Sequence, residues 1–281
     1  MAEKTNNLDL DGLREEIRDR VKIFSEKVIS AFGDNLQNIT IVGSSLTEDF
    51  RPGQSDINTV LVLGRQSLDS LDTLARMARS MNKKGVAVPL LMTPEYIERS
   101  RDVFGIEFLD FQLTHKTIYG DDPFASLTIA KTDVRLQCER ELKATLIRLR
   151  QGYIAAAANK RLVRDILVSA AGGLVPLLRA MLWLKDIDRG VLVEQVFIKA
   201  ASEFSIKADS LIDAKKWRHK KSFFQISFQI SKCTTVFESM RDIKKWRHKK
   251  ATLQKSDVSS VFESIYANVE QLAFIVDKLE V

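Results

Sequence analysis

The hydrophobic pattern of this chain changes once along its length, near residues 120–127. Before that point, short β-rich apolar runs alternate with segments in which apolar residues recur every three and four positions. After it there is a single proline, Pro176, and long stretches carry the helical spacing alone. Strands that alternate with helices are typical of a layered α/β domain, whereas helical periodicity alone indicates a bundle. We therefore predict an α/β domain, a mixed sheet with flanking helices, over 1–125 and an all-α helical bundle over 126–281.

The first part of the chain is expected to supply the sheet and its covering helices. Helical spacing over 8–32 and 67–84 predicts two amphipathic helices. Thr93-Pro94 predicts the start of a short helix, because threonine is a common N-cap and proline fits the first helical position. Expected strands are 38–43, 57–63, 86–92, 104–111 and a short one at 117–119.

Composition places the 281 residues among globular proteins, since 45% are apolar and 28% are charged. We expect no membrane partner, because no continuous apolar run reaches the roughly 18–20 residues that cross a bilayer. The polar, acidic beginning of the sequence does not resemble a signal peptide. Two cysteines, Cys138 and Cys233, cannot form a disulfide framework. A cytoplasmic location is the expectation from these features.

The net charge of +6 comes from one segment, 213–255, which holds 13 basic and 3 acidic residues. This segment contains the sequence KKWRHKK twice, at Lys215–Lys221 and Lys244–Lys250. Trp217 and Trp246 could stack on bases within a basic surface, which predicts weak nucleic-acid binding. The alternative is a lysine-rich connector between helices, with each tryptophan packed on the bundle. The apolar run at 223–230 fits either a strand or a buried helix.

A short motif joins the first two expected strands. Ile41–Ser44 ends the first strand, and Asp56 and Asn58 open the second after an 11-residue gap. Residues two apart on a strand point to the same face, so both side chains should lie together. Gly43 would let the backbone approach a phosphate closely, and Ser44 would add a hydroxyl at a helix N-terminus that favours an anion.

This motif resembles the signature of the polymerase-beta-like nucleotidyltransferase superfamily. In that family a strand leads to Gly-Ser, an Asp-x-Asp pair follows on the next strand, and a later strand gives a third carboxylate. The resemblance implies that Glu107, in the expected strand 104–111, is this third carboxylate. Tyr119–Pro123, followed by a helical domain, resembles the domain junction of bacterial members with a helical C-terminal domain.

The resemblance implies a reaction and a set of site residues. The expected reaction is transfer of a nucleoside monophosphate from a nucleoside triphosphate, expected to be ATP, to a hydroxyl of a small molecule or a protein. It implies that Mg²⁺ is held by Asp56, Asn58 and Glu107, with Asp56 and Glu107 as the catalytic residues. Carboxylates in this arrangement can hold two ions for displacement at phosphorus. In the family a basic helical domain can close over the triphosphate. Nucleotide contacts are therefore expected from Gly43, Ser44, Lys131 and Arg135, the last two of which lie on one expected helix face.

One residue departs from the family pattern, because the second position of the metal pair is Asn58 and not aspartate. An amide oxygen can coordinate a cation but brings no negative charge, so the two-metal site would be impaired. Two alternatives to an enzyme therefore remain. One is a non-catalytic module that binds a nucleotide or a protein, and the other is nucleic-acid binding through 213–255. The sequence does not identify the acceptor.

Overall fold

The computed structural model of the chain describes residues 8–217 and 257–281. The chain divides into two compact units, Met1–Val134 and Arg135–Val281. The expected boundary after residue 125 lies in the segment that leads into the first long helix of the bundle. Most of the first KKWRHKK copy, all of the second, and the ambiguous run at 223–230 lie outside the described residues. Nucleic-acid binding through them stays a prediction.

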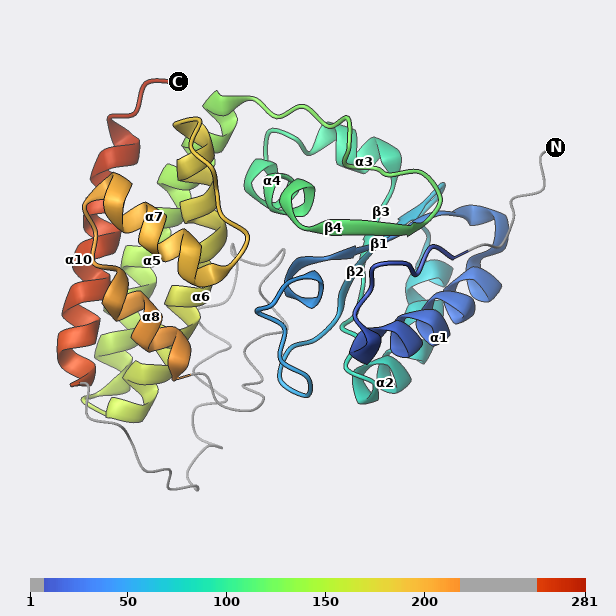
Figure 1. Cartoon of the computed structure of the whole chain (residues 1–281), viewed down its shortest axis with the longest axis horizontal. Coiled ribbons are helices and arrows are strands. Elements are labelled where there is room, and N and C mark those ends of the chain that lie inside the picture. Colours follow the sequence, from blue (N-terminus) through green and yellow to red (C-terminus); the bar gives the residue numbers. More distant parts are fainter. Residues whose placement is uncertain (1–7, 218–256) are drawn as a thin grey trace. The chain divides into compact units, whose positions relative to one another are not determined.

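The first unit is built on a four-stranded mixed sheet (Figure 1). Its strands are β1 (Leu36–Val42), β2 (Asn58–Leu63), β3 (Leu90–Met92) and β4 (His115–Tyr119), in the spatial order β3-β2-β1-β4. β1 pairs antiparallel with both β2 and β4, and β2 pairs parallel with β3. The mixed sheet expected from the sequence is confirmed.

One face of the sheet is covered by α1 (Glu15–Phe32) and α2 (Leu68–Lys83) (Figure 1). Alternate strand residues such as Ile39 and Leu61 bury themselves there together with Val21 and Phe24 of α1. Both helices were expected, although α1 begins later than residue 8. The delay has a local cause, because Gly12 has a φ of +71° and forms a turn just before the helix.

The opposite face of the sheet carries α3 (Pro94–Arg99) and α4 (Gly105–Leu113) (Figure 1). Thr93 caps α3 as predicted, since its side chain accepts a hydrogen bond from the Tyr96 N–H at 3.1 Å. The prediction of a strand at 104–111 is wrong, because this segment forms α4. Its apolar residues satisfy a strand alternation and also the helical i, i+4, i+7 spacing. Packing decides in favour of the helix: Phe108 and Phe111 both bury themselves against the sheet with Phe124.

The remaining expected strands are shorter or longer than predicted. Within 86–92 only Leu90–Met92 form a strand, while Val86 makes an isolated bridge to Ile57. Pro89 lies between the two pairings and has no N–H to donate to a ladder, which explains the interruption. The short strand predicted at 117–119 exists and begins two residues earlier, as β4.

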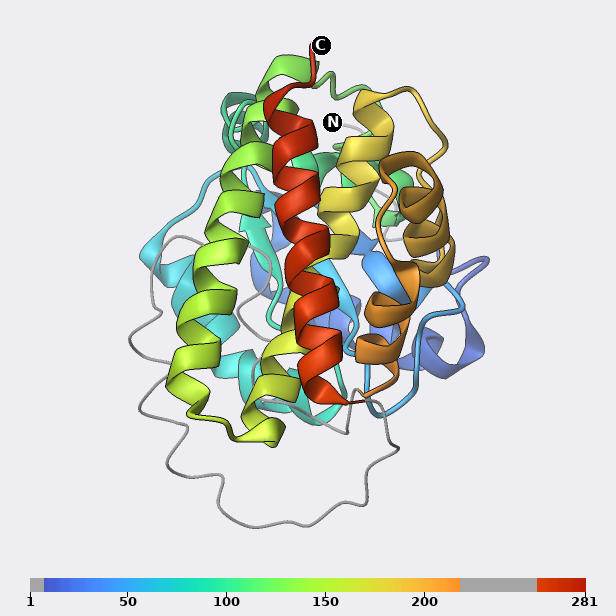
Figure 2. The same cartoon turned by 90° about the vertical axis from the view of Figure 1, so that its left-hand side faces the viewer.

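The second unit is a helical bundle, as predicted. Its helices are α5 (Lys131–Ala156, whose first turn precedes the division), α6 (Lys160–Leu184), α7 (Val193–Phe204), α8 (Ala208–Lys216) and α10 (Val258–Asp277). Figure 2 shows the long α5 and α10 running side by side, green and red respectively. α6 is packed by α7, α8 and α10, so it forms the centre of the bundle.

Among the described helices, α6 is long and apolar enough to cross a membrane, by length and composition only. Its most apolar window has a mean hydropathy of 1.7. The sequence-based expectation considered only continuous apolar runs, and charged residues interrupt this helix. Core helices of soluble proteins have the same properties, and 56% of this window is buried. Arg164 and Arg179 lie in the helix and are largely buried, and Arg179 donates hydrogen bonds to the carbonyl oxygens of Gly190 and Val191. The helix thus has the neighbours expected of a bundle core.

The tryptophan of the first basic repeat is within the described residues and packs on the bundle. The Arg164 guanidinium lies over the Trp217 ring, 5.4 Å from its centroid, and donates a hydrogen bond to the Trp217 carbonyl at 2.9 Å. This arrangement agrees with the interpretation of the repeat as a connector whose tryptophan packs on the helices.

Replacing Phe108 by alanine should destabilise the first unit strongly. Phe108 is fully buried between the sheet and the rings of Phe104, Phe111 and Phe124, with centroids 6.1–6.5 Å away. Removing such a side chain costs about 3–5 kcal/mol. We expect this loss in the hydrogen-exchange protection of β1 and β2 amides. Val103→Ala is the control, since Val103 is 45% exposed and should change protection little.

Candidate functional site

The turn that leaves β1 depends on Gly43. Its φ is +78°, a conformation that side chains with a Cβ rarely adopt. The Gly43 N–H donates a hydrogen bond to the Thr114 carbonyl at 3.0 Å, which fixes the turn against the start of β4. The chain then forms η2 (Gly43–Leu46), a short 3₁₀ helix. The expected order of strand, Gly-Ser and short helix is therefore present.

Asn58 lies directly beside this turn. The β1–β2 ladder pairs Val42 with Asn58, and a Cβ added to Gly43 would come within 3.8 Å of the Asn58 Nδ2. Asp56 and Asn58 are both half-buried, whereas Ile57 between them is fully buried in the opposite layer. The alternation predicted for this segment thus puts both polar side chains on one face, next to Gly43.

The polar groups at this turn are available to a ligand. Within the described residues, the side chains of Ser44, Asp56 and Asn58 make no hydrogen bond or ion pair. All three are half-buried, which makes each a poor candidate for a purely solvated surface residue. A hydroxyl, a carboxylate and an amide that converge without partners form a small polar site that can accept and donate hydrogen bonds.

Sequence reasoning missed a basic residue in the loop between the two halves of the motif. Phe50 is buried in the core beneath the sheet and anchors this loop. Arg51 follows it and is exposed, and its N–H donates a hydrogen bond to the Ser55 hydroxyl at 3.2 Å. The backbone of Arg51 is therefore held against Ser55, the residue that precedes Asp56. Arg51 is the single arginine in the 11-residue gap, and this could have indicated a basic residue near the motif from the sequence.

The third carboxylate is not where the resemblance implies. Glu107 was expected on a strand, and this is wrong because it lies in α4. No aspartate or glutamate occurs in β3 or β4, nor at Val86–Val88 beside the start of β2. α4 does pack on the face that carries Asp56 and Asn58. α4 carries two half-buried carboxylates, Glu107 and Asp110, and Asp110 is the nearer in sequence to Thr114, whose carbonyl accepts the hydrogen bond of Gly43.

The donor set suits one Mg²⁺ better than two. Among residues 8–217 and 257–281, no group of three or more His, Cys, Asp or Glu side chains is placed to hold a metal ion. Asp56 and Asn58 together offer one carboxylate and one amide oxygen. Magnesium commonly binds through one or two carboxylates and takes its other ligands from water and substrate phosphates. These residues therefore fit a single ion that arrives with a nucleotide, and they lack the charge for a two-ion site.

The two basic residues expected to contact the nucleotide begin the first long helix. Lys131 is the first residue of α5, and Arg135 lies one turn further along, as the spacing predicted. Arg135 is engaged in the bundle: its Nη1 donates to the Val276 carbonyl at 3.0 Å and contacts Glu139 Oε2 at 3.1 Å. A cation near the last carbonyls of α10 is electrostatically favourable. This contact gives Arg135 a structural role.

Comparison with solved structures supports the fold. The chain is similar to the crystal structure of spectinomycin adenyltransferase AAD(9) from Enterococcus faecialis with ATP and spectinomycin. The TM-score is 0.51 at 9% sequence identity, and the match covers 90% of this chain and 98% of that chain. No protein family matches the sequence. No curated protein matches it either. The likeness confirms the expected fold, a mixed sheet with flanking helices followed by a helical domain, as in that adenyltransferase.

Replacing Gly43 by alanine should strain the turn without causing a clash. Nothing lies closer than 3.8 Å to the added Cβ, so the cost comes from the φ of +78° and should be about 1–2 kcal/mol. We expect this loss in hydrogen-exchange protection at the β1 end of the sheet. Gly172→Ala is a matched control, because Gly172 lies inside α6, its added Cβ would come no closer than 4.0 Å to another side chain, that of Lys215, and alanine favours helix. A Gly43→Ala protein with unchanged protection would show that the turn is relaxed.

Proposed function

We propose that this chain binds a nucleoside triphosphate, expected to be ATP, beside Gly43 and transfers its nucleoside monophosphate to a hydroxyl of a small molecule. The observation that carries the proposal is the convergence of three unpartnered, half-buried polar side chains on a glycine turn. These are Ser44, Asp56 and Asn58. Such a turn accommodates a phosphate chain, because the backbone lies open and a helix begins there.

Each residue of the site has a separate task in this proposal. The missing side chain at Gly43 leaves room for the phosphate chain, the Ser44 hydroxyl donates to a phosphate oxygen, and the exposed Arg51 offsets the negative charge of the phosphates. The Asp56 carboxylate and the Asn58 amide oxygen would hold one Mg²⁺ against the phosphates. When bound, the ion supplies positive charge that stabilises the transferring phosphoryl group.

The proposal for the acceptor side of the reaction is supported by the structurally similar protein and by the carboxylates of α4. The structurally similar protein is named for adenyl transfer to spectinomycin and was solved with ATP, so a small hydroxylated acceptor is the reasonable starting class. A hydroxyl that attacks phosphorus must lose its proton to a base. We assign this role to a carboxylate of α4, Glu107 as the resemblance implies or Asp110 one turn later.

A specific observation favours a second candidate, nucleotide binding without transfer. The strands beside β1 and β2 carry no carboxylate, and Asn58 brings no charge. Binding of a nucleotide needs the glycine turn and one metal ligand. Transfer additionally needs a base and enough negative charge to organise the reacting groups. The requirements of binding are proposed to be met by residues that lie beside one another at the glycine turn. The additional requirements of transfer would have to be met by the carboxylates of α4.

Replacing Asp56 by alanine tests the binding site itself. In calorimetric titrations with ATP, GTP, CTP and UTP, we expect magnesium-dependent binding of at least one nucleotide to the natural protein. Asp56→Ala should weaken it by tenfold or more, because the one carboxylate among the metal ligands is lost. Asp34→Ala is the control, since it removes one exposed acidic residue just before the other end of β1. Equal affinities for Asp56→Ala and the control, or no nucleotide binding at all, would refute the proposed site.

Replacing Asn58 by aspartate separates the two candidates. The added charge should tighten magnesium-dependent nucleotide binding by roughly fivefold, a change of about 1 kcal/mol, which is the upper end for a partly exposed ion pair. Pyrophosphate release from the nucleotide is measured with a set of hydroxylated small molecules as acceptors. Release by the natural protein that is lost in Glu107→Gln or Asp110→Asn supports transfer. Release that appears only after Asn58→Asp identifies a binding module.

A further inference from the structure

A second concave site lies in the first unit, away from the glycine turn. It is an open-mouthed cavity of about 680 Å³ where β1 begins and β2 ends, lined there by Asn38 and Val62 and bordered by α3 and the segment 120–127. Asn38 lies four positions before Val42 on β1, so the cavity and the glycine turn are about 13 Å apart along the strand. The volume falls within the ~300–1,000 Å³ range of small-molecule sites.

One wall of the cavity has no regular secondary structure yet is fixed to the sheet. Gly120 has a φ of +73°, and a Cβ there would lie only 1.9 Å from the Gln37 carbonyl oxygen. The Asn38 side chain donates a hydrogen bond to the Asp121 carbonyl at 2.6 Å. Only glycine allows the backbone at position 120 to lie this close to β1. The start of the segment is therefore packed directly against β1.

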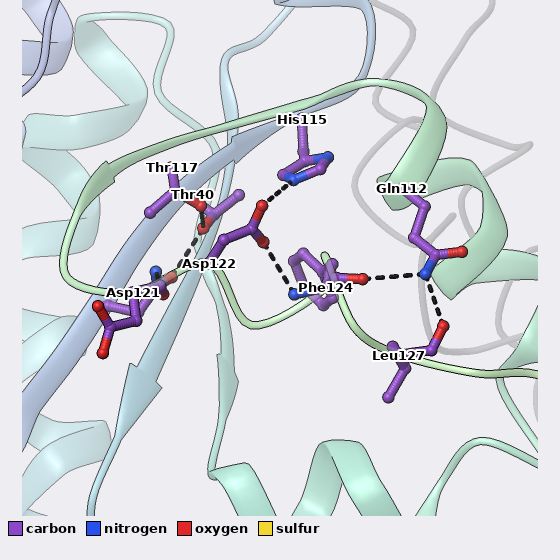
Figure 3. A network of polar contacts seen from close by, with 9 residues as sticks. Thr40, Gln112, His115, Thr117, Asp121, Asp122, Phe124 and Leu127 are labelled. Carbon is purple, nitrogen blue, oxygen red and sulfur yellow. Dashed lines mark hydrogen bonds and ion pairs between the residues drawn. The ribbon is translucent and has the colours of Figure 1, made fainter.

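Further side chains hold the rest of this wall (Figure 3). The Gln112 amide of α4 donates to the carbonyls of Phe124 at 2.9 Å and Leu127 at 2.7 Å. Asp122 accepts a hydrogen bond from the Phe124 N–H at 2.9 Å and contacts His115 Nε2 at 2.7 Å. Because these contacts are all made within the chain, its own residues hold the wall in place, and the entropic cost of binding there is reduced.

The electrostatics of Asp122 agree with a fixed wall. Burial acts to raise the pKa of this carboxyl, but hydrogen bonds from His115 and from the Phe124 and Ala125 amides outweigh it, and the net pKa is lowered. The contacts therefore favour the ionised form. Their contribution to stability is present above the unfolded pKa and is lost only as the pH falls through the lowered folded value. At neutral pH the wall keeps its negative side chain.

The lining has a clear chemical preference. Its apolar side chains include Val62, Ile97 and Leu127, and none of the lining residues is lysine, arginine or histidine. Three lining residues are acidic, but Asp122 is bound as described and Glu98 pairs with Arg101 at 2.6 Å. Asp121 alone has a carboxylate without a partner in the described chain, and Figure 3 shows it turned away from the His115–Asp122 pair.

We propose that this cavity binds a small organic cation, a primary amine on an apolar body, with the ammonium group at Asp121 and the body on Val62, Ile97 and Leu127. Two observations determine this class of ligand. The only uncommitted charge among the lining residues is negative, and about half of the lining surface is apolar, with Val62, Ile97 and Leu127 among its side chains. The site is independent of the nucleotide proposal, because none of its lining residues belongs to the glycine turn or to the Asp56–Asn58 pair.

The test is a calorimetric titration of the full chain with tyramine. Its matched probe is 3-(4-hydroxyphenyl)propionate, which replaces the amine by a carboxylate on the same body. We expect saturable binding of tyramine that weakens with ionic strength and is absent for the acid. Asp121→Asn should weaken it roughly three- to fivefold, as for an exposed ion pair. Ser126→Trp should abolish it, because Ser126 is exposed and lines the cavity.

Two control variants make the result interpretable. Ala125→Trp adds the same bulk at an exposed neighbour outside the lining, and Asp56→Ala removes the nucleotide motif. Both should bind tyramine as the natural chain does. The proposal is overturned if neither probe binds, if amine and acid bind equally, or if Asp121→Asn and Ser126→Trp bind like the controls. Loss in Asp56→Ala alone would assign tyramine to the nucleotide site. Loss of nucleotide binding with tyramine binding intact would contradict only the proposed function.

Discussion

The antiparallel pairing of β1 with β2 is the constraint on which the candidate site depends. Val42 pairs with Asn58, so the residue that follows β1 and the residue that begins β2 meet at one end of the sheet. A register shift of one residue would exchange the two faces of β2. Asp56 and Asn58 would then point into the apolar layer of α1 and α2, where an unpaired carboxylate is costly. The buried Ile57, Leu61 and Leu63 hold the register that prevents this.

The two faces of the sheet are covered in different ways, and this difference leaves room for ligands on one of them. Under α1 and α2 the face is apolar nearly throughout. On the other face, apolar packing is concentrated at the centre, where Val60 meets Phe108 and Phe111 of α4. Polar residues occupy both ends of that face: Asn58 with Asp56 at one, and Asn38 at the other. The aromatic cluster thus stabilises the layer and separates the two polar ends.

The sequence predicted the parts of this arrangement that depend on local periodicity. Asp56 and Asn58 share a face because strand side chains alternate, and Thr93-Pro94 begins a helix because capping is local. The segment 104–111 was misassigned since its apolar residues fit both periods, and only the contact of Phe108 with Phe124 selects the helix. For the same reason Glu107 was predicted on a strand, whereas it lies in the helix α4.

Long-range contacts account for the features that could not be predicted. The wall at 120–127 begins with the turn-forming residues Gly120 to Pro123. These residues predict a loop, but they do not predict where the loop lies on the sheet. Its position follows from hydrogen bonds to side chains distant in sequence, such as Asn38 and Gln112. Arg51 could have been noticed as the single arginine of its loop, but its closeness to the motif depends on the burial of Phe50.

The charge at the glycine turn limits what the site can do once a nucleotide is bound. A triphosphate and Asp56 together carry more negative charge than a single Mg²⁺ and Arg51 offset, so the proposed complex would stay net negative. A second ion would need further carboxylates as ligands. Among the described elements on this face, β3 and β4 have none, whereas α4 carries Glu107 and Asp110. The choice between the two proposed functions, transfer and binding alone, therefore rests on α4, the segment whose helical structure is decided by tertiary packing.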